Sequence, residues 1–94
     1  MTQTRRQFAY LAHLRNLATV AAAIADGDMP TAPELAALVG VDERTIYRYL
    51  TMLREFGAPL PASPGNRDGY RFTRRWDFGG ALLRWLKRDN RENP

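Results

Sequence analysis

The sequence predicts a small, mainly α-helical domain with four helices and one antiparallel β-hairpin. Two observations support this prediction. Apolar residues recur at helical spacing in four segments, and clusters of Gly, Pro and Asp separate these segments. The stretch 59–73 departs from that spacing, because it begins rich in Pro and Gly and ends with strand-like alternation. With 94 residues the chain forms a single domain, 1–94, whose small core leaves little room for an active-site cleft.

The first helix is expected over residues 4–25, where the turn residues Asp26-Gly27-Asp28 end it. At about 100° per residue its apolar side chains form one stripe. The stripe consists of Tyr10, Leu11, Leu14, Leu17, Ala18, Ala21 and Ile24. His13 lies at the edge of this stripe. Because no other ligand-type residues cluster beside it, we do not expect a metal site there.

A short second helix, 32–39, is expected to lead through a tight turn into a third helix, 42–56. Thr31 stands at the N-cap of the second helix, with a glutamate three residues later, which is capping-box spacing. Gly40 suits a left-handed C-cap, and Asp42 suits the next N-cap. Helix, glycine turn and helix together have the sequence form of a helix-turn-helix.

A β-hairpin is expected after the third helix. Its strands would be Leu60–Ser63 and Tyr70–Thr73, with the Pro- and Gly-rich loop at the tip. Residues 29–31 could add a third short strand. Tyr70 and Phe72 would share one face of the hairpin and lie against the helices.

The fourth helix is expected over residues 79–90, after the Gly79-Gly80 break. Leu82, Trp85 and Leu86 cluster on one side of it. We expect this side either to complete the core or to meet a second subunit.

The positive charge is concentrated in one segment. Residues 43–75 contain seven arginines and three acidic residues, an excess that equals the net charge of +4 for the whole chain. Such a segment suits contact with a polyanion, although arginine-rich segments are often only solvated surface. The chain has no cysteine and no apolar run long enough to span a bilayer, so we expect a cytoplasmic protein.

The third helix has two chemically different sides. Ile46, Leu50 and Leu53 define the side expected to be buried, and Tyr49 falls beside it. The opposite side and its flanks present groups that can contact base edges and phosphates. The residues expected to read bases are Arg44, Thr45, Tyr47, Arg48 and Thr51. Any surface helix carries polar residues opposite its core, so the preceding tight turn and the local charge excess are what favour nucleic acid.

The stretch PTAPELAALVGVDERTIYRYLTMLREFGAPLPASPGNRDGYRFT, residues 30–73, resembles the winged helix-turn-helix domain of DeoR-type and WYL-domain bacterial transcription regulators. The resemblance rests on ELA in the second helix, a G-V turn, R-T-I-Y-R, L-R-x-x-G-x-P and a G-Y wing strand. It implies that Arg44, Thr45, Tyr47 and Arg48 read DNA, and that Arg67 and its neighbours lie on the wing. An acidic residue usually follows R-T-I-Y-R, where this chain has Tyr49. No effector-binding segment follows residue 73, so a stand-alone module without a small-molecule effector is expected.

We therefore predict a winged helix-turn-helix with an added long N-terminal helix and an added C-terminal helix. The residues expected on the DNA backbone or the wing are Thr31, Arg54, Arg67, Arg71 and Arg74. The candidate dimer contacts are Phe8, Leu11, Leu82, Trp85 and Leu86.

The expected function is sequence-specific binding of double-stranded DNA by a small repressor, acting as a homodimer on an inverted repeat. The alternative is a protein-interaction adaptor with the same fold. The chain has one serine, one histidine and no phosphate-binding glycine loop, so neither an enzyme nor a cofactor is expected.

Overall fold

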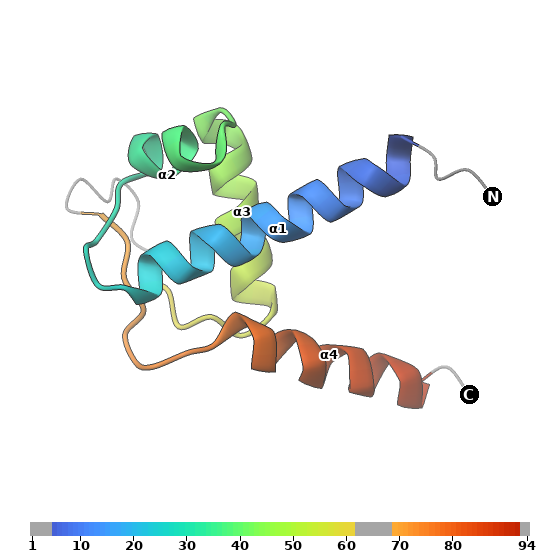
Figure 1. Ribbon diagram of the computed structural model, residues 1–94. Coiled ribbons are helices and arrows are strands. Elements are labelled where there is room, and N and C mark those ends of the chain that lie inside the picture. The colour runs from blue at the N-terminus through green and yellow to red at the C-terminus, as the bar shows by residue number, and fades with distance from the viewer. Residues whose placement is uncertain (1–4, 62–68, 93–94) are drawn as a thin grey trace.

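The computed structural model describes residues 5–61 and 69–92, and the side chains of residues 10–61 and 69–88 within them. These residues form four helices (Figure 1), namely α1 (Arg5–Ala25), α2 (Ala32–Val39), α3 (Glu43–Glu55) and α4 (Phe78–Glu92). α1 crosses α3 and contacts all three other helices, while α2 packs against both α1 and α3. The N-terminal half of α1 and the C-terminal half of α4 extend from the body on the same side.

The core lies where α1, α2 and α3 meet. Its least exposed large side chains, each with less than 2% of their surface accessible, are Val20, Ile24, Leu35, Ile46, Leu50 and Leu53. No polar or charged residue is buried among the residues whose side chains are described. Burial of each such aliphatic side chain contributes roughly 1.5–3 kcal/mol to the free energy of folding. The inner face of α3 is therefore held mainly by hydrophobic contact with α1 and α2.

α1 is longer than the core it covers. Leu17, at 4% exposure, marks the start of the buried part of its apolar stripe. Closer to the N-terminus, Tyr10, Leu11 and Leu14 are 65%, 57% and 40% exposed. Of the residues expected in this stripe, the rest of the chain therefore covers Leu17, Ala21 and Ile24, whereas Ala18 is exposed like the three N-terminal residues.

The turn between α2 and α3 is fixed by its caps. Gly40 adopts the left-handed conformation (φ 74°, ψ 38°), and the N–H groups of Gly40 and Val41 both donate to the Ala36 carbonyl, at 2.9 and 3.0 Å. Asp42 begins the next helix two residues later, where its carboxylate accepts a 2.8 Å hydrogen bond from the Thr45 N–H. The two helices thus follow each other with almost no linker.

The predicted β-hairpin wing over 59–73, and with it the winged fold class, is wrong: the described residues contain no strand, and 29–31 add none. Two isolated backbone hydrogen bonds join the segments, from the Tyr70 N–H to the Pro30 carbonyl (2.8 Å) and from the Thr73 N–H to the Pro59 carbonyl (2.9 Å). The Thr73 hydroxyl also donates to the Pro59 carbonyl, at 3.2 Å. Residues 62–68, which include part of the expected first strand and its tip, lie outside the described residues.

Proline explains why no ladder forms. Pro59 and Pro61 have no N–H, and the N–H of Leu60 between them donates to the Ala58 carbonyl, at 2.8 Å. The 58–61 segment therefore has no donor left for a partner strand. The expected alternation survives without a sheet, because Tyr70 is buried, Phe72 is half-buried and Arg71 is exposed.

Aromatic side chains replace the sheet in attaching this segment. Phe72 packs against Trp76 with ring centroids 5.2 Å apart, and Trp76 lies 6.2 Å from Phe78. Phe78 in turn contacts Phe56 at the end of α3, at 5.5 Å. The chain from residue 70 to the start of α4 is thereby fixed to the end of α3 through ring contacts, and the Phe72–Trp76 and Phe56–Phe78 pairs have the favourable edge-to-face geometry.

Two glycines with similar backbone angles test the packing of this segment. Gly69 (φ +94°) lies so close to the backbone carbonyl of Met29 that a β-carbon would collide with it, whereas a β-carbon on Gly27 (φ +88°) would meet nothing within 4 Å. Gly27→Ala should cost roughly 1–2 kcal/mol, because it places a side chain in the left-handed region. Gly69→Ala should lower the free energy of unfolding by about 2 kcal/mol more than Gly27→Ala does, because the Met29 carbonyl must also move. Urea unfolding of both variants measures the difference, and equal costs would contradict the described approach of residues 29 and 69.

Candidate nucleic-acid interface

α3 presents a buried face and an exposed face along its whole length. Ile46, Tyr49, Leu50 and Leu53 are at most 2% exposed and lie toward α1 and α2. The exposed side chains on the other side are Arg44, Tyr47, Arg48, Thr51, Met52 and Glu55. Among the residues expected to read bases, only Thr45 is half-buried. The structure therefore places two arginines, a tyrosine and a threonine on one open helical face.

Met52 on this face was not among the expected site residues. It is 40% exposed and falls about 40° from Arg48 on the helical wheel. The helical spacing that selected the arginines could have found it. An exposed methionine adds a flexible apolar group between the charged ones.

The N-terminus of α3 combines a cap with two nearby arginines. Hydrogen bonds from Thr45 hold the pKa of the Asp42 carboxyl below its usual range, and the positive charges of Arg44 and Arg48 lower it further. Asp42 is therefore ionised at neutral pH. It occupies part of the positive end of the helix, while the two arginines remain exposed beside it.

Tyr49 fixes the rotation of α3 against α1. Its ring is 2% exposed, its hydroxyl lies 2.7 Å from Nδ1 of His13, and it accepts a 3.1 Å hydrogen bond from Asn16. The sequence placed Tyr49 beside the core, but nothing in it could pair the hydroxyl with residues more than thirty positions away. His13 thus has a structural partner on α3. Within the described residues, no three His, Cys, Asp or Glu side chains gather as a metal site would require.

Thr31 and Arg54, two of the residues expected on the DNA backbone, have internal hydrogen bonds. The N–H of Glu34 donates to the hydroxyl oxygen of Thr31 at 3.4 Å, and the N–H of Thr31 donates to the Glu34 carboxylate at 2.8 Å, which completes the capping box of α2. The Thr31 hydroxyl also donates to this carboxylate, at 3.0 Å, and the two hydrogen bonds that the carboxylate accepts lower the pKa of Glu34. Arg54 is half-buried and donates from Nη2 to the Pro61 carbonyl, at 2.9 Å. It holds the segment that follows α3.

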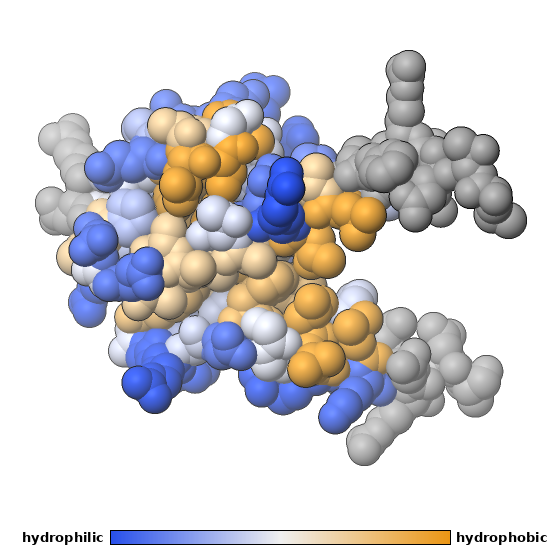
Figure 2. Space-filling view, in the orientation of Figure 1, coloured by the Kyte–Doolittle hydropathy of each residue, from blue (hydrophilic) through white to orange (hydrophobic). Residues whose placement is uncertain are grey.

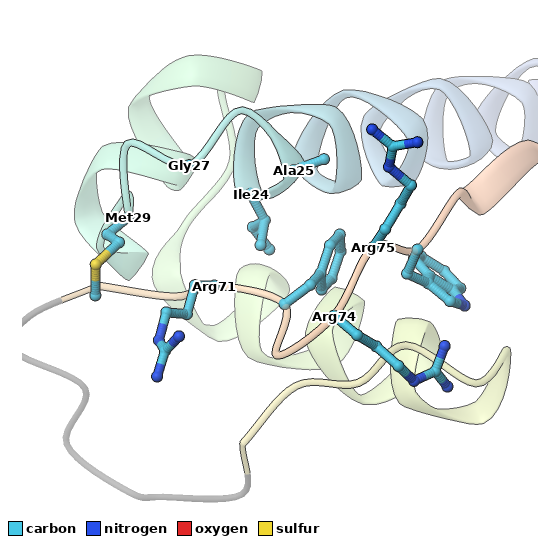
Figure 3. A pocket seen from close by; sticks show the side chains of 9 residues that line it. Ile24, Ala25, Gly27, Met29, Arg71, Arg74 and Arg75 are labelled. Atoms are coloured by element: carbon cyan, nitrogen blue, oxygen red, sulfur yellow. The ribbon is translucent and has the colours of Figure 1, made fainter.

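Arg71 and Arg74 are exposed on the segment between α3 and α4. With Arg75 they border a cavity of about 410 Å³, whose apolar part is formed by Ile24, Met29, Phe72 and Trp76. The three guanidinium groups point in different directions in Figure 3, with Arg71 and Arg75 on opposite sides of the backbone. They therefore spread positive charge over the surface and do not converge on one anion. Arg67 lies outside the described residues.

The candidate dimer contacts are placed differently from one another. Leu11 and Leu86 are 57% and 43% exposed, and Trp85 is 41% exposed although its ring lies 5.6 Å from that of Phe56. Leu82 is half-buried against the core. The side chain of Phe8 lies outside the described residues.

None of the described helices is both long enough and apolar enough to cross a membrane.

Comparison with protein families matched residues 22–71 to the family described as HTH domain, for helix-turn-helix. The match runs from the last turn of α1 through α2 and α3, and it covers more than half of the chain. The narrower resemblance to DeoR-type and WYL-domain regulators stays a prediction. Comparison with curated proteins and with solved structures gave no significant match.

The cap at Asp42 predicts how stability depends on pH. Because the pKa of Asp42 is lower in the folded than in the unfolded chain, its contribution is present above its ordinary value of 3.8 and is lost as the pH falls below that value. Asp42→Ala should therefore lower the unfolding temperature at pH 7, and this difference should shrink toward pH 3. Asp42→Asn, which keeps the acceptor oxygen without the charge, should lower it less at pH 7. Thermal unfolding followed by circular dichroism measures the unfolding temperatures of the wild type and both variants. If the difference between the wild type and Asp42→Ala did not change with pH, the role of the ionised Asp42 as a cap would be contradicted.

Proposed function

The chain belongs to the HTH domain family, and from this premise we propose that it is a transcription regulator that binds a specific sequence of double-stranded DNA. α3 is the second helix of the motif and would enter the major groove, where helices of this type contact base edges. α2 and α1 would hold it in place from behind.

The open face of α3 is the observation that supports this proposal most strongly. Arg44, Tyr47, Arg48 and Thr51 are exposed together, while the opposite side of the same helix is almost completely buried. A helix fixed in this way cannot rotate its arginines away from a ligand without exposing Ile46 and Leu50 to water. The face is therefore preorganised for contact.

Each group on this face has a distinct use in DNA recognition. Arg44 and Arg48 can each bind guanine O6 and N7 with a bidentate guanidinium, and Tyr47 can reach a phosphate or a base edge. Thr51 donates its hydroxyl proton to the Tyr47 carbonyl, at 3.1 Å, so its methyl group is the part best suited to contact a thymine methyl. We assign Thr45 a supporting role, because it is half-buried and its N–H donates to the capping carboxylate of Asp42.

Backbone contacts would come from arginines outside α3. We assign Arg71 and Arg74 to phosphates, since both are exposed and spread charge over the surface. Arg54 is assigned instead to the attachment of the 57–61 segment, because its guanidinium already donates to Pro61.

We propose further that the protein is a repressor that binds as a homodimer to an inverted repeat. Occupation of a DNA site is enough to exclude other proteins from it, and a two-fold dimer requires two half-sites about 34 Å, or a multiple of that, apart. Selection of bound sequences from a random DNA pool tests this directly. An adaptor protein would instead yield no enriched sequence, and a single unrepeated site would contradict the dimer.

Arg48 should affect sequence preference. Arg48→Ala should lose roughly 1–3 kcal/mol of binding to the selected site and relax the preference at one base position. Arg48→Lys keeps the charge but not the bidentate geometry, so it should lose most of the same preference while retaining more of the nonspecific affinity. Fluorescence anisotropy with the selected site and with each single-base variant measures this. Equal losses on selected and random DNA would contradict base reading by Arg48.

Arg71 should affect the salt dependence and not the sequence preference. Arg71→Ala should weaken binding to all sequences alike and reduce the slope of log K against log salt by about 0.9, the value for one lost phosphate contact. Arg15, which is exposed on α1, provides the matched control. Arg15→Ala should leave the slope unchanged. A change in base preference for Arg71→Ala, or an unchanged slope, would contradict the phosphate assignment.

A further inference from the structure

One side of α1 is apolar, exposed and unoccupied. Five positions that fall within about 80° of the helical wheel are Leu or Ala, and each is exposed. These residues, which we call the α1 stripe, are Leu11, Leu14, Ala18, Ala22 and Ala25. In Figure 2 orange and pale-orange atoms cover the face between α1 and α4, where this stripe lies. Nothing within the described chain covers it.

A groove runs beside the inner half of the α1 stripe. It has a volume of about 370 Å³ and lies between α1 and the start of α4. One wall is formed by Leu14, Ala18, Ala22 and Ala25 together with Ala21, and the other wall includes Phe78, Gly79 and Leu82. Among the described residues that line the groove, Asp77 is the charged one. Leu14 and the three alanines of the stripe thus border this hollow, whereas Leu11 projects beyond it.

The α1 stripe is complementary to itself when two copies run antiparallel. A two-fold axis at Ala18 pairs Leu11 with Ala25 of a second copy and Leu14 with Ala22 of that copy. Every large residue then faces a small one, which is the arrangement that lets two helices approach to about 8–10 Å. The leucines of each copy would enter the groove of the other, so the same surface is used twice, as an isologous dimer requires.

The charges of the sequence fit the same antiparallel arrangement. α1 begins with Arg5 and Arg6, while Asp26 and Asp28 follow its C-terminal end. Antiparallel pairing brings the basic start of one helix toward the acidic end of the other, and it also opposes the two helix dipoles. A parallel pair would place like charges and like ends of the dipoles together.

We propose that the α1 stripe binds the α1 stripe of a second copy of this chain, antiparallel about Ala18. The inference rests on the proposed function, since it supplies the interface of the dimer that an inverted repeat requires. α1 is then the dimer helix, and each copy fills the groove of the other.

The first experiment measures the oligomeric state of the full chain without DNA. Sedimentation equilibrium should show a dimer for the wild type, and Ala18→Glu should raise the dissociation constant roughly tenfold or more, because two carboxylates then face each other on the axis. Ala12→Glu is the matched control, since Ala12 is also exposed on α1 but on the other side. Circular dichroism verifies that both variants fold. A monomeric wild type, or equal effects of the two substitutions, would overturn the proposal. Leu83 is exposed on α4, and sensitivity of the dimer to Leu83→Glu alone would overturn the proposal by moving the interface to α4.

A second pair of variants tests the antiparallel register. Ala22→Leu places a leucine against Leu14 of the second copy and should weaken the dimer, whereas Leu14→Ala/Ala22→Leu exchanges the large and small partners and should restore it. Failure of the double variant to recover would contradict this register. Because the chain has no cysteine, Ala18→Cys also gives a direct readout, as it should form a symmetric disulfide on oxidation while Ala12→Cys should not.

The dimer and the DNA-binding function fail in different ways. If the dimer proposal alone is wrong, the wild type sediments as a monomer and still selects a DNA sequence. If the DNA-binding proposal alone is wrong, the chain dimerises through α1 and selects none. Ala18→Glu should bind a single half-site as well as the wild type does, because Ala18 lies on α1 and not on the exposed face of α3.

Discussion

The burial of one side of α3 determines most of what this protein can do. Ile46, Leu50 and Leu53 have almost no accessible surface, and they fill the space between α1 and α2. Since these side chains cannot leave the core without exposing apolar surface to water, the opposite side of the same helix has a fixed orientation. The side of the helix from which Arg44 and Arg48 project is therefore set without contacts made by the arginines themselves. The Tyr49 hydroxyl, bonded to His13 and Asn16, adds a directional constraint that hydrophobic contact lacks.

The α2–α3 motif could be predicted from the sequence because its determinants are local. Thr31 with Glu34, the left-handed Gly40 and Asp42 act within three or four residues of their own positions, and helical spacing alone separates Ile46 from Arg48. Such features depend little on the rest of the chain. The same reasoning identified the exposed face of α3, and it could have included Met52.

Features that depend on distant segments could not be predicted in the same way. The alternation at Tyr70, Arg71 and Phe72 suggested a strand, and it does alternate between buried and exposed positions. A strand also needs a partner with free donors, and Pro59 and Pro61 remove them from the nearest candidate. Ring contacts from Phe72 through Trp76 to Phe78 hold the segment instead. Likewise, the hydrogen bond between Tyr49 and His13 joins α3 to α1 across 36 positions of the chain, and no local sequence pattern indicates that these two helices lie side by side.

α1 connects the two proposed interfaces. Within two turns it presents His13 and Asn16 to Tyr49 of α3 on one side, and Leu11, Leu14 and Ala18 on another. In the proposed dimer the recognition helices of the two copies would therefore be separated by two layers of α1 and by no flexible segment. The distance between the two open faces would then be set by helix packing, which tolerates little variation. A dimer built through α4 would lack this property, because the rings of Phe78 and Trp85 join α4 to Phe56, the C-cap of α3, and not to the buried face of that helix. The direct link from α1 to the inner face of α3 is thus the physical reason that pairing through α1 would give a fixed spacing between half-sites.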